Sequence, residues 1–159
     1  MITIAIDPGV SGGLAWRETD GQTQSCKMPA TEGDVVDLLR HLAITSSPAA
    51  AYVEKVGGFI RGKDKDKGQP GSAMFKFGRG VGVLHGALLA LGVRVIEVTP
   101  QKWQGHIGIG TSKGSASKTA WKNKLKAEAQ RRYPDQRVTL ATADALLMLE
   151  YALAIGRNA

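Results

Sequence analysis

The sequence predicts an α/β fold, in which helices cover both faces of a five-stranded mixed sheet. Apolar runs of strand length occur at residues 2–6, 50–54 and 93–98. Between and after them lie segments whose apolar residues recur with helical spacing. A chain of 159 residues is long enough to bury one full core. We therefore expect a single domain over residues 1–159.

Three strands are expected near the N-terminus, at residues 2–6, about 12–17 and about 22–28. Gly9–Gly13 and residues 19–21 supply the turns that join them. Short turns of this kind connect neighbouring antiparallel strands. The first three strands should therefore form an antiparallel meander.

Helices and strands alternate along the rest of the chain. The expected order is a helix at 33–43, a strand at 50–54, an exposed loop at 57–71, a helix from Ser72 to Leu91, a strand at 93–98, a Gly-rich stretch at 105–116, a basic helix at about 117–132 and a last helix at about 140–156. Ser72 can cap the long helix and Gly92 can end it. Pro100 closes the fifth strand, and Pro134 stops the basic helix.

Composition excludes several classes of protein. Hydrophobic residues make up 43% of the chain, and its mean hydropathy is −0.13. No apolar stretch reaches the ~18 residues of a membrane span, and the first residues show no secretory signal, so we expect no membrane partner. Cys26 is the only cysteine, which excludes an internal disulfide and a cysteine-based zinc site. A cytoplasmic, reducing location is expected.

The positive charge is concentrated in the middle of the sequence. Residues 55–132 carry 16 Lys or Arg against four Asp or Glu, a net charge of +12 within a chain of net charge +7. Such a basic segment favours a polyanion as partner. A solvated basic surface without a partner is the plainer alternative.

Three isolated carboxylates indicate a hydrolytic metal site. Asp7 and Glu54 each end an apolar strand, and Asp144 interrupts an apolar helix. Taken singly, each is better explained by a helix cap or a salt bridge. Together they favour a Mg²⁺ site, because buried carboxylates without a partner are costly and Mg²⁺ prefers oxygen ligands. If the first and fourth strands pair in parallel, Asp7 and Glu54 meet at one edge.

Five short motifs follow one another along the chain. They are Ile6-Asp7-Pro8-Gly9, Val53-Glu54-Lys55-Val56, residues 75–82, Val98-Thr99-Pro100-Gln101-Lys102-Trp103 and Ala143-Asp144-Ala145-Leu146-Leu147. In this order they resemble the RuvC-like Holliday junction resolvases, particularly the phage-type and chloroplast-type branches. The turn after Asp7 also resembles the phosphate-binding turn of actin-like and sugar-kinase ATPases, but those folds need two such domains.

The resolvase resemblance implies an RNase H-like fold, a homodimer and paired symmetric nicks in four-way junction DNA. It implies two Mg²⁺ ions per active site, for which Mn²⁺ can substitute. Asp7, Glu54 and Asp144 match acidic positions of the family's catalytic and metal site, and Lys118 matches a basic residue near the scissile phosphate. In a bacterial or phage-infected cell such a protein would act at the nucleoid; an organelle is the alternative.

Ala141 departs from the family pattern. The resemblance places a further acidic residue about one helical turn before Asp144, where this chain has Ala141. Glu150 lies on a different face of the expected helix and is a poor substitute. Three interpretations stay open: three carboxylates complete the site with a water or backbone oxygen, metal binding is weak, or the change inactivates the site.

The remaining candidates concern DNA and the partner subunit. The predicted DNA-binding residues are Phe59, Arg61, Lys63, Lys76, Arg79, Lys102, Lys113, Lys118 and Lys122. Phe59 either stacks on an unpaired base or folds back onto the core. Gly78, Gly82 and Gly86 are candidates for the dimer interface, because glycines in a helix allow close approach of a partner. Two alternative functions remain: a junction-binding protein that does not cut, and a nuclease for RNA–DNA hybrids or structured RNA.

Overall fold

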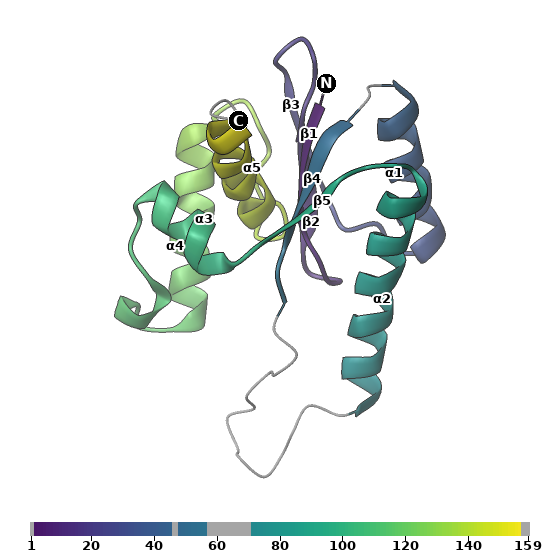
Figure 1. The fold of residues 1–159 in the computed structure, drawn as a ribbon. Helices are drawn as coiled ribbons and strands as arrows, with labels where there is room; N and C mark the ends of the chain where they lie inside the picture. The colour runs from purple at the N-terminus through teal and green to yellow at the C-terminus, as the bar shows by residue number, and fades with distance from the viewer. Residues whose placement is uncertain (1, 46–47, 57–70, 157–159) are drawn as a thin grey trace.

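The protein, seen here as a computed structural model, is described at residues 2–45, 48–56 and 71–156. Its elements in chain order are β1 (Ile2–Asp7), β2 (Gly13–Arg17), β3 (Thr23–Lys27), α1 (Glu32–Thr45), β4 (Pro48–Glu54), α2 (Gly71–Ala90), β5 (Val95–Val98), α3 (Pro100–Ile107), the 3₁₀ turn η1 (Ser112–Gly114), α4 (Lys118–Arg132) and α5 (Ala143–Gly156). Figure 1 shows three layers, with α1 and α2 on one face of the sheet and α3, α4 and α5 on the other.

The sheet has the strand order β3-β2-β1-β4-β5. Strands β1, β2 and β3 pair antiparallel, whereas β4 pairs parallel with both β1 and β5. The prediction of a five-stranded mixed sheet with an antiparallel meander is therefore confirmed, as is the parallel pairing of the first and fourth strands. Parallel pairing brings the carboxyl ends of β1 and β4 to the same edge.

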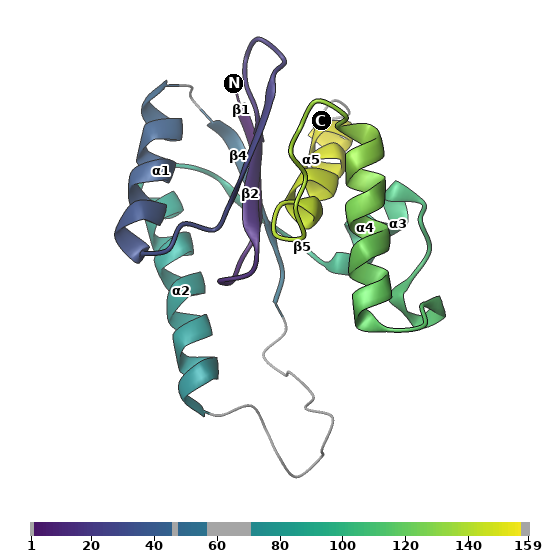
Figure 2. The same cartoon turned by 180° about the vertical axis from the view of Figure 1, so that it is seen from behind.

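The central strand β1 supplies both cores because its side chains alternate between the two faces of the sheet. Ile2, Ile4 and Ile6 pack against α1 and α2, whereas Ala5 belongs to the cluster on the opposite face. Figure 2 shows the same two helical layers from behind. The sheet edge that carries the ends of β1 and β4 thus lies between the two layers.

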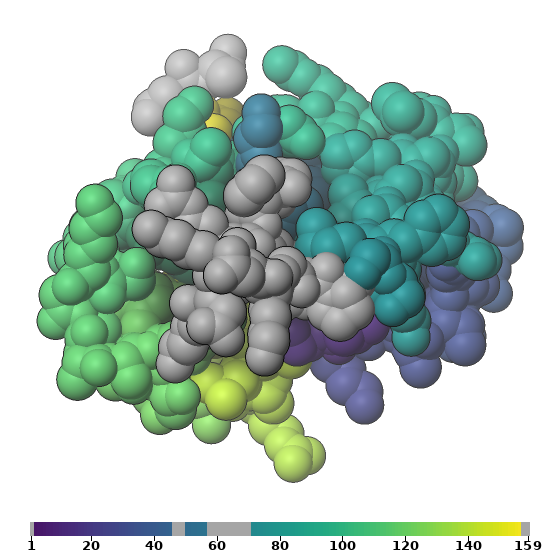
Figure 3. Space-filling model, turned by 90° about the horizontal axis from the view of Figure 1, so that it is seen from below, coloured from purple at the N-terminus to yellow at the C-terminus, as the bar shows by residue number. Residues whose placement is uncertain are grey.

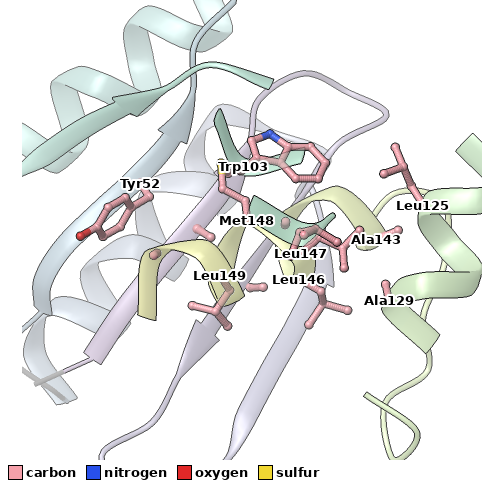
Figure 4. Close-up of a cluster of buried hydrophobic side chains, with 14 of the residues drawn as sticks. Tyr52, Trp103, Leu125, Ala129, Ala143, Leu146, Leu147, Met148 and Leu149 are labelled. Atoms are coloured by element: carbon pink, nitrogen blue, oxygen red, sulfur yellow. The ribbon is translucent and has the colours of Figure 1, made fainter. Parts of the chain in front are cut away.

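Helix α5 is the centre of the second core. All its residues from Ala143 to Leu149 are buried, because the helix lies between the sheet and the outer helices α3 and α4. Figure 4 shows its side chains beside Trp103, Leu125 and Ala129. A helix enclosed in this way is apolar all round, so a carboxylate on it, Asp144, is an exception that needs a reason.

Helix α3 was not predicted. Pro100 was expected only to close a strand, but it occupies the first turn of α3, where its fixed φ and missing N–H are tolerated. Trp103 and Ile107, four residues apart, form the buried face of this helix. Gly108 ends it with φ of 77°, a left-handed conformation that favours glycine. The spacing of Trp103 and Ile107 after a Thr-Pro start was the signal that sequence reasoning missed.

The other predicted helices are present with small shifts at their ends. Helix α2 begins at Gly71 rather than Ser72, and Gly92 follows it with φ of 70° and an N–H bond to the Leu89 carbonyl at 3.0 Å. The loop expected at 57–71 falls almost wholly outside the described residues. None of the helices in the described part of the chain combines the length and hydrophobicity that a bilayer crossing requires.

Candidate active site

Asp7 ends the central strand, at a turn that glycine makes possible. The Asp7 backbone pairs with Gly13 of β2, and the turn closes through a bond from the Gly12 N–H to the Gly9 carbonyl at 3.0 Å. A Cβ atom on Gly12 would lie 2.1 Å from the Asp7 carbonyl oxygen and 3.0 Å from its carboxyl carbon. Only glycine therefore lets the turn fold tightly over this carboxylate.

Glu54 ends β4, directly beside β1. In the parallel register, Ile6 of β1 lies opposite Val53 of β4, so the next residue of each strand is an acid. The Glu54 carboxylate accepts a hydrogen bond from the indole Nε1 of Trp103 at 2.8 Å. Sequence reasoning included Trp103 in a motif but gave it no role.

Asp144 reaches the same edge from the first turn of α5, which packs on β1 and β2. It is 4% exposed, and its Oδ2 forms an ion pair with the Lys122 ammonium of α4. Its Oδ1 atom is buried and has no hydrogen-bond partner among the described residues. A buried carboxylate oxygen without a donor is unfavourable unless a cation completes it.

The three acids affect one another electrostatically. Burial, then repulsion by Glu54 and Asp144, raises the pKa of Asp7 from 3.8 to about 7, although Lys122 opposes the rise. Burial also raises the pKa of Glu54, against the stabilising hydrogen bond from Trp103. Three segments that are distant in sequence thus bring three acids into one electrostatically coupled cluster.

Lys122 is the basic side chain that contacts this cluster. Its burial favours the neutral amine, but attraction to Asp144, Asp7 and Glu54 outweighs burial and raises its pKa. Lys122 was predicted only as a DNA contact, with Lys118 nearest the chemistry. Both line the same cleft, and they lie one turn apart on α4. This spacing places both on one helix face, which is the signal that could have pointed to Lys122.

The carboxylate oxygens of the three acids suit a hard divalent cation, although the side chains are not arranged as a complete metal site. Within the described ranges, no group of three or more His, Cys, Asp or Glu side chains is arranged to hold a metal ion as it stands. Lys122 takes one oxygen of Asp144 instead. The unpartnered Oδ1 of Asp144 and the oxygen-only donor set are nevertheless suited to Mg²⁺.

A cleft of about 770 Å³ opens beside these acids. Glu54 and Asp144 lie in it, and Trp121 forms part of its wall. Its other lining residues include hydroxyl and lysine side chains from the segment between α3 and α4, namely Thr111, Ser112, Lys113, Ser115 and Ser117, together with Lys118 from the first turn of α4. Figure 3 views the molecule from the end where β1 and β4 finish, with the green α3–α4 region on one side and the teal residues of α2 on the other. Hydroxyl and ammonium groups suit a phosphate backbone.

The other predicted DNA contacts are scattered. Lys102 is exposed on α3, outside the cleft lining. Lys76 and Arg79 lie on α2, across the sheet from α4, and Arg79 forms an ion pair with Glu32 of α1 at 2.8 Å. Phe59, Arg61 and Lys63 lie outside the described residues, so their predicted roles stay predictions.

The predicted interface glycines lie on an open surface. A Cβ atom on Gly78, Gly82 or Gly86 would meet nothing within 4 Å, so no packing within the described chain requires glycine there. Phe75 and Leu89 are 74% and 69% exposed on the same helix. Their spacing places both on the stripe that the three glycines form.

Comparison with known proteins gives structural neighbours only. No protein-family model matches the sequence, and neither does any curated protein. The structure of Thermus thermophilus RuvC is similar with a TM-score of 0.61 at 16% identity, over 98% of this chain and 97% of that one. Thermus thermophilus RuvC in complex with a Holliday junction substrate gives a TM-score of 0.66 at 16% identity, over 99% and 96%. The chain therefore has the RNase H-like fold that RuvC adopts.

Proposed function

We propose that this protein is a metal-dependent endonuclease that resolves four-way DNA junctions as a homodimer. One observation carries the proposal: the buried Asp144 and the half-buried Asp7 and Glu54 converge at one sheet edge in a RuvC-like fold. The neighbouring RuvC structure contains a Holliday junction substrate. The basic segment and the hydroxyl-lined cleft supply the complementary surface for a polyanion.

Each residue of the site has a defined part in this proposal. Asp7, Glu54 and Asp144 would hold Mg²⁺, which supplies an activated water and charge stabilisation for phosphodiester hydrolysis. The pKa of Asp7 is raised to about 7, so the carboxylate form that would hold a cation requires loss of its proton near neutral pH. Lys122 now neutralises Asp144, and its ammonium would be available to pair with a backbone phosphate if a cation took over that neutralisation.

A junction-binding protein that does not cut is the second candidate. It is favoured by Ala141, whose carbonyl oxygen would lie only 2.6 Å from a Cβ atom on Gly13, the residue paired with Asp7. Position 141 thus lies next to the strand partner of Asp7, where an acidic side chain could add a metal ligand. Alanine has no carboxylate and adds none.

A gel assay with a labelled four-way junction separates these functions. With Mg²⁺ we expect paired nicks in the junction, and little cutting of a matched linear duplex or an RNA–DNA hybrid. Asp7→Asn should abolish cutting while junction binding in Ca²⁺ stays close to that of the parent, because the carboxylate holds metal and does not grip DNA. Binding without nicks in the parent would favour the non-cutting protein, and preferential cutting of the hybrid would favour the RNA-directed nuclease.

A further inference from the structure

We propose that Trp103 is a positioning residue for the metal site: its indole N–H holds one oxygen of Glu54, so that the other oxygen is aimed at the cation. The inference rests on the proposed metal-binding role of Glu54. The hydrogen bond comes from α3, the helix that the sequence analysis did not predict. It gives the Glu54 carboxylate a fixed orientation in the metal-free protein.

The hydrogen bond is one that both partners need. Trp103 is 0% exposed, and an indole N–H can only donate. A buried N–H without an acceptor is costly, and the Glu54 Oε2 atom at 2.8 Å is its acceptor. Glu54 therefore cannot turn away without leaving the buried indole N–H unpaired.

The backbone around Glu54 is held by the same segment that carries Trp103. Glu54 pairs with Val98 in the parallel register of β4 and β5, and the Lys55 N–H donates to the Val98 carbonyl at 2.8 Å. Helix α3 begins at Pro100, directly after β5, and delivers Trp103 back to the Glu54 side chain. Strand pairing and the indole bond therefore fix the backbone and the carboxylate together.

The indole ring itself has little freedom. It belongs to the buried cluster that contains Leu146, Leu147 and Met148 of α5, and Figure 4 shows it lying against that helix. A ring clamped in a close-packed core keeps its direction, so the donor stays aimed at Glu54. Packing against α5 thus also restricts the orientation of Glu54, through the indole hydrogen bond.

The chemical nature of the donor also matters. Asp144 is paired with an ammonium, which offsets the negative charge that would attract a metal ion. The indole is neutral, so it orients Glu54 without cancelling its charge. Groups that hydrogen-bond to a metal ligand keep that ligand in place, and their removal commonly weakens metal affinity or activity by about 10–100-fold.

The test compares two buried tryptophans of one site. Trp103→Phe keeps an aromatic ring but removes the N–H. Trp121→Phe is the matched control, because Trp121 is 6% exposed, lines the cleft that contains Glu54, and makes no indole hydrogen bond within the described residues. Mn²⁺ binding is measured without DNA, from the free-ion EPR signal or by calorimetry. We expect Trp103→Phe to weaken Mn²⁺ binding by about 10–100-fold and Trp121→Phe to leave it unchanged.

A second variant separates orientation from packing. Benzothienylalanine at position 103 has the shape of tryptophan with sulfur in place of the N–H, so it preserves the core even where phenylalanine does not fold. It should lose Mn²⁺ affinity to the same extent while the protein remains folded. Parental affinity in this variant would overturn the inference while leaving the metal site intact. Absence of Mn²⁺ binding in the parent itself would overturn the proposed metal site, and with it the role of Trp103.

Discussion

At the scale of single residues, the charge of Asp7 couples the site to pH. Its pKa is about 7 in the folded chain and 3.8 as an ordinary aspartate, so between these values the folded state binds more protons than the unfolded state. The stability that this group contributes is complete below pH 3.8 and is lost as the pH rises through 7. Between pH 3.8 and pH 7, one such group lowers the free energy of unfolding by up to about 1.4 kcal/mol for each unit that the pH rises.

We therefore expect the metal-free parent to lose stability relative to Asp7→Asn as the pH rises from 5 to 8. Urea unfolding in EDTA at both pH values measures the difference, with the variant the more stable of the two at pH 8. Mg²⁺ should stabilise the parent at pH 8 and leave the variant nearly unaffected, because the variant lacks a charged ligand. A stability difference that is the same at pH 5 and pH 8 would contradict the burial of Asp7.

Lys122 provides a second prediction at this scale. Asp144 has a side chain only 5% exposed, and removing its partner leaves a buried charge unpaired. Lys122→Met should therefore destabilise the metal-free protein by about 1–3 kcal/mol. Mn²⁺ should raise the melting temperature of this variant more than that of the parent, because the cation replaces the missing ammonium.

Lys118→Met is the control for that experiment. Lys118 lies one turn earlier on α4, borders the same cleft, and forms no ion pair in the part of the chain that the structure describes. Its loss should change stability little, with or without Mn²⁺. Equal destabilisation in both variants, or equal stabilisation by Mn²⁺ in parent and Lys122→Met, would show that the ion pair does not neutralise Asp144.

At the scale of elements, the turn that leads into α5 decides how many carboxylates the site has. Thr139 and Thr142 close this turn, with the Thr139 N–H bonded to Thr142 Oγ1 at 3.0 Å and the Ala143 N–H bonded to the Thr139 carbonyl at 3.0 Å. Ala141 sits inside it, against Gly13 of β2. A side chain introduced here starts from a backbone that lies against Gly13, the strand partner of Asp7.

Ala141→Asp should therefore lower the Mg²⁺ concentration needed for half-maximal cleavage, or raise the cleavage rate, because a fourth oxygen ligand strengthens the site. Mg²⁺ titration of junction cleavage measures both. Ala141→Asn is the control, since it adds similar bulk with a neutral group. No difference between these variants and the parent would mean that three carboxylates already complete the site, or that the added side chain points elsewhere.

At the scale of the whole molecule, α2 presents an apolar, glycine-rich stripe that the described chain does not cover. Each glycine in a helix interior costs about 1 kcal/mol relative to alanine, and nothing within 4 Å requires glycine at positions 78, 82 or 86. The proposed homodimer supplies a reason, because a second copy can approach the bare backbone closely.

Gly82→Leu should then produce monomers in sedimentation velocity at micromolar concentration, and paired nicks should give way to single ones. His41→Leu places the same side chain at an exposed position of the neighbouring helix α1 and should leave the dimer intact. A parent protein that sediments as a monomer would refute this assembly, whatever the variants do.

Hydrophobic patterning alone was sufficient to predict most elements of this molecule. The apolar run of β1, the helical spacing in α1 and the mostly apolar sequence of α5 are local signals, and each of these elements is present in the structure. Helix α3 was missed because the two residues that define its buried face are separated by polar and glycine residues. Its amphipathic pattern is too short to stand out from a loop.

The sequence by itself determined the sheet, its two helical layers and the three acids of the candidate site, because these depend on the order of apolar runs and on where each run ends. Only the tertiary structure decided how the acids are partnered. Trp103 meets Glu54 across 49 positions of sequence, and Lys122 meets Asp144 across 22. Such contacts depend on how α3, α4 and α5 pack at one edge of the sheet. A local sequence pattern cannot predict which side chains of distant segments will be neighbours, because those segments meet only in the folded chain.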